Sequence, residues 1–181
     1  MIYLFLADGF EEMEALAPVD ILRRAGLDVK TVGVTGKTVT SSRKIPVVAD
    51  ITTDEISYDD MDMVILPGGL PGTVNLENSK IVSDAVLYCN DNDKYIAAIC
   101  AAPRVLGKLG VLKGKNATCF PGNEEALING GANHLTDSVV VDGKVITGKG
   151  AGVAVKFSLA IVEALCGKEA SDKLFHGMQC E

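Results

Sequence analysis

The sequence predicts an α/β fold, a mostly parallel central sheet covered by helices on both faces. Along the 181 residues, short apolar runs of strand length alternate with amphipathic segments of helical length. The runs are apolar throughout, which suits central strands with helices on both sides. The β-α-β order favours parallel strands joined by crossover helices. No repeat, linker or low-complexity tract marks a boundary, so we expect a single domain over residues 1–181.

Four apolar runs are predicted to form the central strands, namely Ile2–Ala7, Val29–Val34, Met63–Leu66 and Tyr95–Ile99. The segment Glu12–Ala25 lies between the first two and is predicted to be a helix. Gly26 follows it, and Arg23 and Arg24 place cations at its negative end. Pro18 lies inside the segment, so the helix either begins late or kinks there.

The second half of the chain adds shorter elements. Ser79–Asn90 is predicted to be the helix before the fourth strand, and Ala117–Cys119 a short strand. Val139–Val141 and Lys144–Thr147 are predicted to form a hairpin, because Asp142–Gly143 between them is a strong two-residue turn signal.

Two segments differ from this pattern. Val153–Leu165 is apolar nearly all round, so we expect a helix deep in the structure, stopped by Gly167. Thr38–Asp50 alternates polar and apolar residues and contains Pro46, which predicts an excursion at the edge of the sheet.

Composition excludes several classes of function. Lys and Arg number 17 and Asp and Glu 24, giving a net charge of −7, which argues against a nucleic acid or an anionic membrane as partner. The five cysteines are odd in number and widely spaced, which favours free thiols in a reducing compartment rather than disulfides or zinc ligands. Met1–Leu6 lacks a basic leader, and Val153–Cys166 is too short and too charged to span a bilayer. We therefore expect a cytoplasmic protein without metal or cofactor.

The first candidate for chemistry is Cys100, at the end of the fourth apolar run. Small residues flank it on both sides, and Pro103 stands where a new helix would take its first turn. A sharp strand-to-helix turn needs small neighbours and exposes the central side chain at the carboxyl edge of the sheet, where α/β proteins bind ligands. The alternative interpretation is a buried structural cysteine.

An ordinary thiol is only about 3% ionised at pH 7, so a reactive Cys100 needs help. A helix N-terminus supplies ~0.3–2 kcal/mol, and further donors must come from backbone N–H groups or a protonated acid. Gly68 and Gly69, after the third run, could bring backbone N–H groups close to a ligand, with the Ala101 N–H as a second donor. The alternative is an ordinary glycine turn. The acidic segment Asp8–Glu14, after the first run, could supply a buried protonated carboxyl or be a solvated turn, and its spacing does not select one residue.

These segments together resemble one family. The chain is similar, from Met1 to about Lys173, to the DJ-one branch of the ThiJ/PfpI family, in the blocks Gly9–Glu14, Pro18–Gly26, Leu66–Gly69, Ala97–Pro103, Asn129–Gly131 and Ala160–Glu169. The resemblance implies a flavodoxin-like three-layer sandwich and a homodimer.

The resemblance also assigns roles to residues. It implies that Cys100 is the oxidation-prone reactive cysteine and that Glu14 is the protonated partner that hydrogen-bonds its thiolate. It implies that Gly69 and Ala101 are the backbone donors of the oxyanion pocket. It places Arg43 near the pocket and the dimer interface.

Two departures from the family pattern concern histidine. Family members often carry a histidine directly after the cysteine or just before a proline in the following strand, and here these positions are Ala101 and Phe120. His134 and His176 match neither position and are interpreted as surface residues. A Cys-His protease dyad is therefore not expected, and a proton shuttle would fall on Glu14.

Two functions remain open at the level of sequence. The first is a glutathione-independent glyoxalase or deglycase that acts on methylglyoxal-like α-oxoaldehydes or on their adducts with glycated protein. In this function Cys100 would form a hemithioacetal and Glu14 would be the acid/base. The second is an oxidative-stress-sensing or chaperone dimer that uses oxidation of Cys100. Cys119 as a resolving thiol is a weaker hypothesis, because strand alternation directs it opposite to Phe120.

Overall fold

The computed structural model describes residues 1–180 and contains a seven-stranded sheet with the order β10-β11-β7-β6-β1-β2-β5. All neighbouring strands pair in parallel except the β10–β11 hairpin. The strands are β1 (Ile2–Leu6), β2 (Val29–Gly33), β5 (Ile51–Thr52), β6 (Met63–Leu66), β7 (Tyr95–Ile99), β10 (Val139–Asp142) and β11 (Val145–Gly148). The four predicted central strands, the mostly parallel sheet and the hairpin across Gly143 are confirmed.

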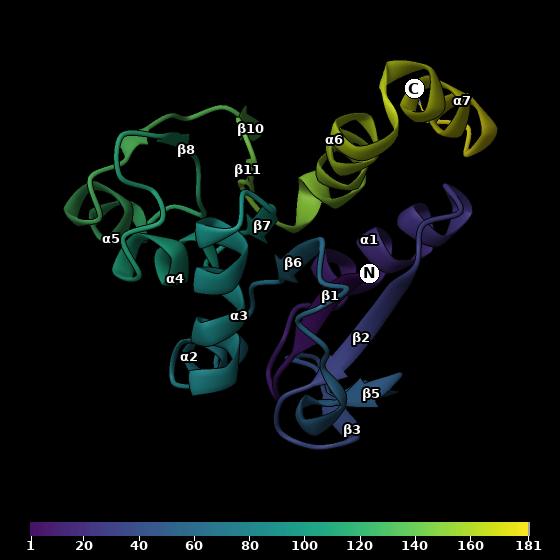
Figure 1. Cartoon of the computed structure of the whole chain (residues 1–181). Helices are drawn as coiled ribbons and strands as arrows, with labels where there is room; N and C mark the ends of the chain where they lie inside the picture. The colour runs from purple at the N-terminus through teal and green to yellow at the C-terminus, as the bar shows by residue number, and fades with distance from the viewer. Residues whose placement is uncertain (181) are drawn as a thin grey trace.

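Helices cover both faces of this sheet (Figure 1). One face packs on α1 (Glu12–Arg24) and α6 (Ala154–Cys166), with α7 (Lys168–Gly177) against α6. The other face packs on α2 (Gly72–Glu77), α3 (Lys80–Asp91), α4 (Pro103–Lys108) and α5 (Glu124–Asn129). Successive residues of a strand point to opposite faces of the sheet. Leu4 therefore packs in the core under α1 and α6, and Phe5 packs in the core under α2, α3, α4 and α5. This is the expected flavodoxin-like three-layer sandwich.

Two small sheets lie outside the main one. β3 (Thr38–Thr40) and β4 (Pro46–Val48) form an antiparallel pair, which confirms the predicted excursion at the edge. β8 (Asn116–Ala117) pairs with β9 (Asn133–His134). The predicted strand Ala117–Cys119 is therefore shorter than expected, because its residues beyond Ala117 leave the ladder and turn toward the end of β7.

The structure decides how Pro18 is accommodated. Helix α1 begins at Glu12 and continues through Pro18, so the alternative of a late start is wrong. The Glu11 side chain caps the helix by accepting a hydrogen bond from the Glu14 N–H at 2.8 Å. This cap fixes the first turn before the proline occurs, and the first turn carries Glu14.

Helix α6 also differs from expectation. Phe157, Ile161 and Val162 are fully buried, but Val155 and Lys156 are exposed. One face of the helix therefore lies at the surface, and the predicted position deep in the structure holds only for the opposite face. The predicted stop at Gly167 is confirmed, with a left-handed φ of 87°. No helix within residues 1–180 combines the length and the apolar character needed to cross a bilayer.

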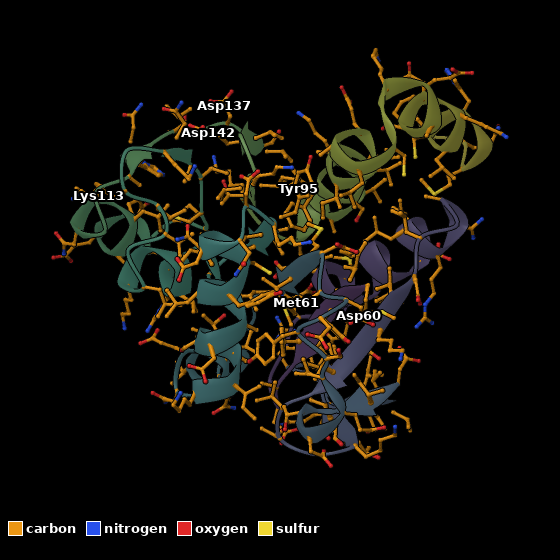
Figure 2. The ribbon with its side chains drawn as sticks, in the orientation of Figure 1. Asp60, Met61, Tyr95, Lys113, Asp137 and Asp142 are labelled. Atoms are coloured by element: carbon orange, nitrogen blue, oxygen red, sulfur yellow. The ribbon has the colours of Figure 1, made fainter. Side chains whose placement is uncertain are left out.

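The amino ends of the strands are held by side-chain hydrogen bonds. The Tyr95 hydroxyl, labelled in Figure 2, donates to the carbonyl of Ala164 in α6 at 3.0 Å. The Tyr3 hydroxyl donates to Asp60 Oδ1 in the loop before β6 at 3.1 Å. The opposite edge, where the parallel strands end, carries the segments that the sequence singled out.

Candidate active site at Cys100

Cys100 stands on a tight turn between β7 and α4. Its φ is 64°, the left-handed region that residues with a side chain rarely occupy. Two backbone hydrogen bonds hold it there: its N–H donates to the Gly148 carbonyl at 2.9 Å, and its carbonyl accepts from the Phe120 N–H at 2.7 Å. Ala101 and Ala102 are small and buried, which lets the chain turn directly into Pro103 at the start of α4. The side chain of Cys100 remains half-buried at the sheet edge, as predicted for a nucleophile elbow.

Glu14 reaches this turn from the first turn of α1. The residue is completely buried, and its Oε2 accepts a hydrogen bond from the Gly68 N–H at 2.9 Å. Its carboxyl also contacts the Cys100 side chain. The second oxygen, Oε1, is buried and meets no well-aligned donor within residues 1–180. A carboxylate oxygen left in this state is costly, so the site favours a proton on Glu14.

The electrostatics of Glu14 agree with this geometry. Burial, with the negative charge of Glu11 as a smaller contribution, raises the pKa of the Glu14 carboxyl from 4.5 to about 7. Hydrogen bonds from the Cys100 side chain and the Gly68 N–H oppose the shift. Glu14 is therefore poised to gain and lose a proton near neutral pH, which suits a general acid or base.

The sulfur of Cys100 is coupled to this carboxyl. Burial and an ionised Glu14 raise the pKa of the Cys100 thiol to about 12, while the N–H groups of Ala101 and Gly69 face the sulfur and lower its pKa. With a thiol pKa of about 12 beside a carboxyl pKa of about 7, the two groups cannot both be anions at neutral pH, and the pair holds at least one proton. The thiolate expected from the sequence therefore requires the proton to reside on Glu14.

Glycine at position 68 allows the two side chains to meet. A Cβ atom on Gly68 would lie 2.6 Å from Cys100 Cβ and 2.6 Å from Glu14 Oε2, far inside contact distance. The neighbouring Gly69 has a left-handed φ of 92°, which turns its N–H toward the sulfur. The paired glycines therefore serve a close approach rather than an ordinary turn.

Arg43 lies apart from this pair. It is exposed in the β3–β4 turn, and its backbone N–H donates to Glu12 Oε1 at 2.9 Å. The Ser41 hydroxyl donates to the same oxygen, so buried Glu12 fastens the turn to α1. Within residues 1–180 the hydrogen bond of Arg43 goes to Glu12 rather than to Cys100 or Glu14, and its expected place near the pocket and the dimer interface stays a prediction.

The histidines and the second thiol contribute nothing to the pair. His176 is exposed on α7, and His134 in β9 faces Glu124. Cys119 is buried in the core under α2–α5, whereas Cys100 packs toward the opposite core. Burial raises the pKa of the Cys119 thiol to about 11. The difference from Cys100 is access, because Cys119 is buried and Cys100 is half-buried at the sheet edge.

Two contributors to the site were missed by sequence reasoning. Glu11 caps α1 and raises the pKa of Glu14, and Gly148 anchors the elbow through its carbonyl. Glu11 gives only a weak capping signal along the sequence, because Ser, Thr, Asp and Asn are the residues preferred at an N-cap. Gly148 carries no such signal, because only the pairing of β11 with β7 brings it to Cys100.

The fold and the site define a class of protein: a flavodoxin-like α/β sandwich that presents a cysteine on a strained elbow beside a buried acid. A family model described as the DJ-1/PfpI family matches residues 1–164. The chain belongs to the DJ-1/PfpI family.

Individual relatives support this assignment. Protein dj-1beta of Drosophila melanogaster is 39% identical over 176 residues, covering 97% of this chain and 94% of the relative. Its crystal structure superposes with a TM-score of 0.94 over 99% of this chain and 97% of that one. The oxidized DJ-1 of Toxoplasma gondii has a TM-score of 0.92 at 30% identity, covering 98% and 97% of the two chains. A Caenorhabditis elegans relative named glutathione-independent glyoxalase DJR-1.2 is 33% identical over 164 residues, covering 91% of this chain and 87% of the relative.

Proposed function

We propose that this protein converts α-oxoaldehydes such as methylglyoxal to α-hydroxy acids without glutathione, with Cys100 as nucleophile and Glu14 as acid/base. The observation that carries the proposal is the Cys100–Glu14 pair, in which a strained thiol faces two N–H donors and one buried carboxyl. The glyoxalase name of the nematode relative supports the same class of reaction.

The first step forms a covalent adduct. The Cys100 sulfur attacks the aldehyde carbon, and a proton from the pair passes to the aldehyde oxygen to give a hemithioacetal. The N–H groups of Gly69 and Ala101 face the position of the sulfur and would stabilise the oxyanion that develops there.

The second step moves hydrogen within the adduct. Ionised Glu14 removes the proton from the former aldehyde carbon and returns it to the neighbouring carbon through an enediolate. The first carbon is thereby oxidised and the second reduced, so no external oxidant is needed. Water then cleaves the resulting thioester, releasing the hydroxy acid and restoring the thiol. In the deglycase variant, Cys100 would instead displace the protein amine or thiol from the aldehyde-derived carbon of the adduct. The bond to the protein breaks, the protein side chain leaves with a proton from the pair, and the same hemithioacetal on Cys100 results.

The test is direct. Purified protein should produce lactate from methylglyoxal in the absence of glutathione. Cys100→Ala should abolish this activity, and Glu14→Gln should lower kcat by roughly 10²–10⁴-fold, the usual contribution of a general acid/base. Cys166→Ala is the matched control, because Cys166 is an exposed thiol at the far end of α6. Lactate production that survives Cys100→Ala, or none from the wild type, contradicts the proposal.

A second candidate function is oxidation sensing at the same cysteine. Cys100 is half-buried beside a carboxyl that can donate a proton, and a solved relative is described as oxidized. A sulfinate on Cys100 would accept hydrogen bonds from protonated Glu14 and the Gly69 N–H. Mild peroxide should then add two oxygens to Cys100 alone, as read by peptide mass spectrometry. Selective addition without turnover favours the sensor, and scattered oxidation of all five thiols counts against both functions.

We also propose that the protein acts as a homodimer. Met13 and Leu16 on α1 and Val155 on α6 are large apolar side chains exposed to solvent. With small residues between them they line a mostly apolar groove of about 520 Å³. A contiguous apolar patch of this kind is typical of a protein–protein contact, and α1 within it also carries Glu14.

A further inference from the structure

Phe120 is an aromatic side chain exposed beside the nucleophile. Its side chain is 50% exposed, although a phenylalanine with a purely structural role is normally buried. Its backbone is fixed: the N–H donates to the Cys100 carbonyl at 2.7 Å, and the carbonyl accepts from the N–H and Nδ2 of Asn123 at 3.2 and 3.0 Å. The main chain therefore holds the ring at the elbow without enclosing it.

Gly150 determines where the ring lies. A Cβ atom on Gly150 would stand 3.2 Å from Phe120 Cδ2, tighter than an ordinary contact, so the ring rests on the bare backbone of this residue. Gly150 is two residues beyond Gly148, which accepts the Cys100 N–H. The loops after β11 and β8 thus meet next to the elbow, whose Cys100 side chain also approaches Gly68 and Glu14.

We propose that Phe120, seated on Gly150, is the specificity-determining wall of the site. It directs the enzyme toward α-oxoaldehydes whose carbon-2 substituent is aromatic or branched and apolar. The inference rests on the proposed glyoxalase function. An apolar ring has no proton to transfer, so what it offers a substrate is contact area. Glu14 then remains the acid/base. Phe120 determines which aldehyde binds and does not take part in proton transfer.

The reaction balance is that of the proposed activity. Phenylglyoxal and water give mandelate, with one carbon oxidised and its neighbour reduced. Methylglyoxal gives lactate by the same steps. The two substrates differ in the group that would contact the Phe120 ring but follow the same chemical steps. The ratio of their kcat/KM values therefore measures the contribution of Phe120 to substrate selectivity.

The first experiment measures this ratio, phenylglyoxal over methylglyoxal. Phe120→Ala should lower it about ten-fold, since one apolar contact surface discriminates by roughly that factor. Phe120→Leu should keep most of it. Gly150→Ala, which pushes on the ring from below at an extended φ that alanine accepts, should lower it about two- to three-fold. Val141→Ala, an equally exposed apolar residue on the edge strand β10, should leave it unchanged.

A second measurement separates this inference from the proposed function. The rate at which N-benzyl iodoacetamide alkylates Cys100, divided by the rate for iodoacetamide, measures the contact of a benzyl group with Phe120 without requiring turnover. Phe120→Ala should lower that relative rate about five- to ten-fold. If the wild type converts neither aldehyde but Phe120→Ala abolishes the benzyl preference, the wall stands and the glyoxalase proposal fails. If Phe120→Ala leaves the benzyl preference within two-fold of wild type, the wall is overturned, whatever the aldehyde kinetics show.

Discussion

The proton shared by Glu14 and Cys100 is the feature on which reactivity depends at the scale of single residues. The sulfur faces the N–H groups of Gly69 and Ala101, whereas the carboxylate accepts one N–H, from Gly68. These N–H donors lower the cost of a charge on sulfur, but burial and an ionised Glu14 still hold the pKa of the thiol at about 12, above the pKa of about 7 of the carboxyl. A thiolate therefore forms only while Glu14 holds the proton. The protonated carboxyl can then donate to the thiolate.

Removing that donor should make the thiol harder to ionise. We expect Glu14→Ala to raise the pKa of Cys100 relative to wild type by about one unit, because a hydrogen bond to an anion is lost. Glu14→Gln should raise it less, since the amide can still donate. Thiolate absorbance against pH measures both, with Cys100→Ser as the blank. A lower pKa in Glu14→Ala would show that the carboxylate acts mainly by repelling the thiolate.

The same carboxyl makes stability depend on pH. Its pKa is about 7 in the fold and 4.5 as a free group, so the native state holds the extra proton between these values. Stability contributed by this group is therefore lost as pH rises from about 4.5 to about 7, up to about 3 kcal/mol. We expect Glu14→Gln to gain stability over wild type across that window. Urea unfolding at about pH 5 and about pH 7.5 measures the gain, and an equal difference at both would contradict it.

At the scale of elements, the site is a meeting of three turns. The cap of α1 supplies Glu14, the loop after β6 supplies Gly68 and Gly69, and the elbow after β7 supplies Cys100. The parallel register of β1, β6 and β7 ends these strands side by side, so the three turns share one edge. None of them forms the site alone.

Gly68 tests this arrangement, because any side chain there comes between two of the turns. We expect Gly68→Ala to cost at least ten-fold in kcat/KM and about 1–3 kcal/mol in stability, since the new methyl clashes with Cys100 Cβ and the Glu14 carboxyl. Gly177→Ala is the matched control, because a methyl group there meets nothing within 4 Å. Enzyme kinetics and urea unfolding provide the two readouts. A Gly68→Ala variant as active as the control would show that the Cys100–Glu14 contact is dispensable.

At the scale of the whole molecule, the apolar groove between α1 and α6 leaves part of the helical layer that these two helices form open to solvent. Leu16 and Val155 face solvent there although the helices that carry them pack tightly on the sheet. Burying this groove against a second copy would also place a rigid support behind the first turn of α1.

A charge in the groove should separate the subunits. We expect wild-type protein to sediment as a dimer and Leu16→Glu to weaken dimerisation at least 100-fold, because an unpaired buried carboxylate costs several kcal/mol. Ile128→Glu is the control, since Ile128 is an exposed apolar residue on α5, on the opposite side of the sheet. Sedimentation velocity at several concentrations measures the change. A Leu16→Glu protein that remains dimeric places the interface elsewhere.

The sequence by itself determined the strands, the parallel sheet, the hairpin and the elbow at Cys100, because apolar runs, turn residues and helix stops are local signals. It also placed the glycines and the acidic segment at the correct sheet edge, since parallel strands all end there. Only the tertiary structure selected Glu14 from that segment, showed that Gly148 anchors the elbow, and seated Phe120 on Gly150. These choices depend on which strands are neighbours and how closely two turns approach, and such distances between remote segments leave no periodic trace along the chain.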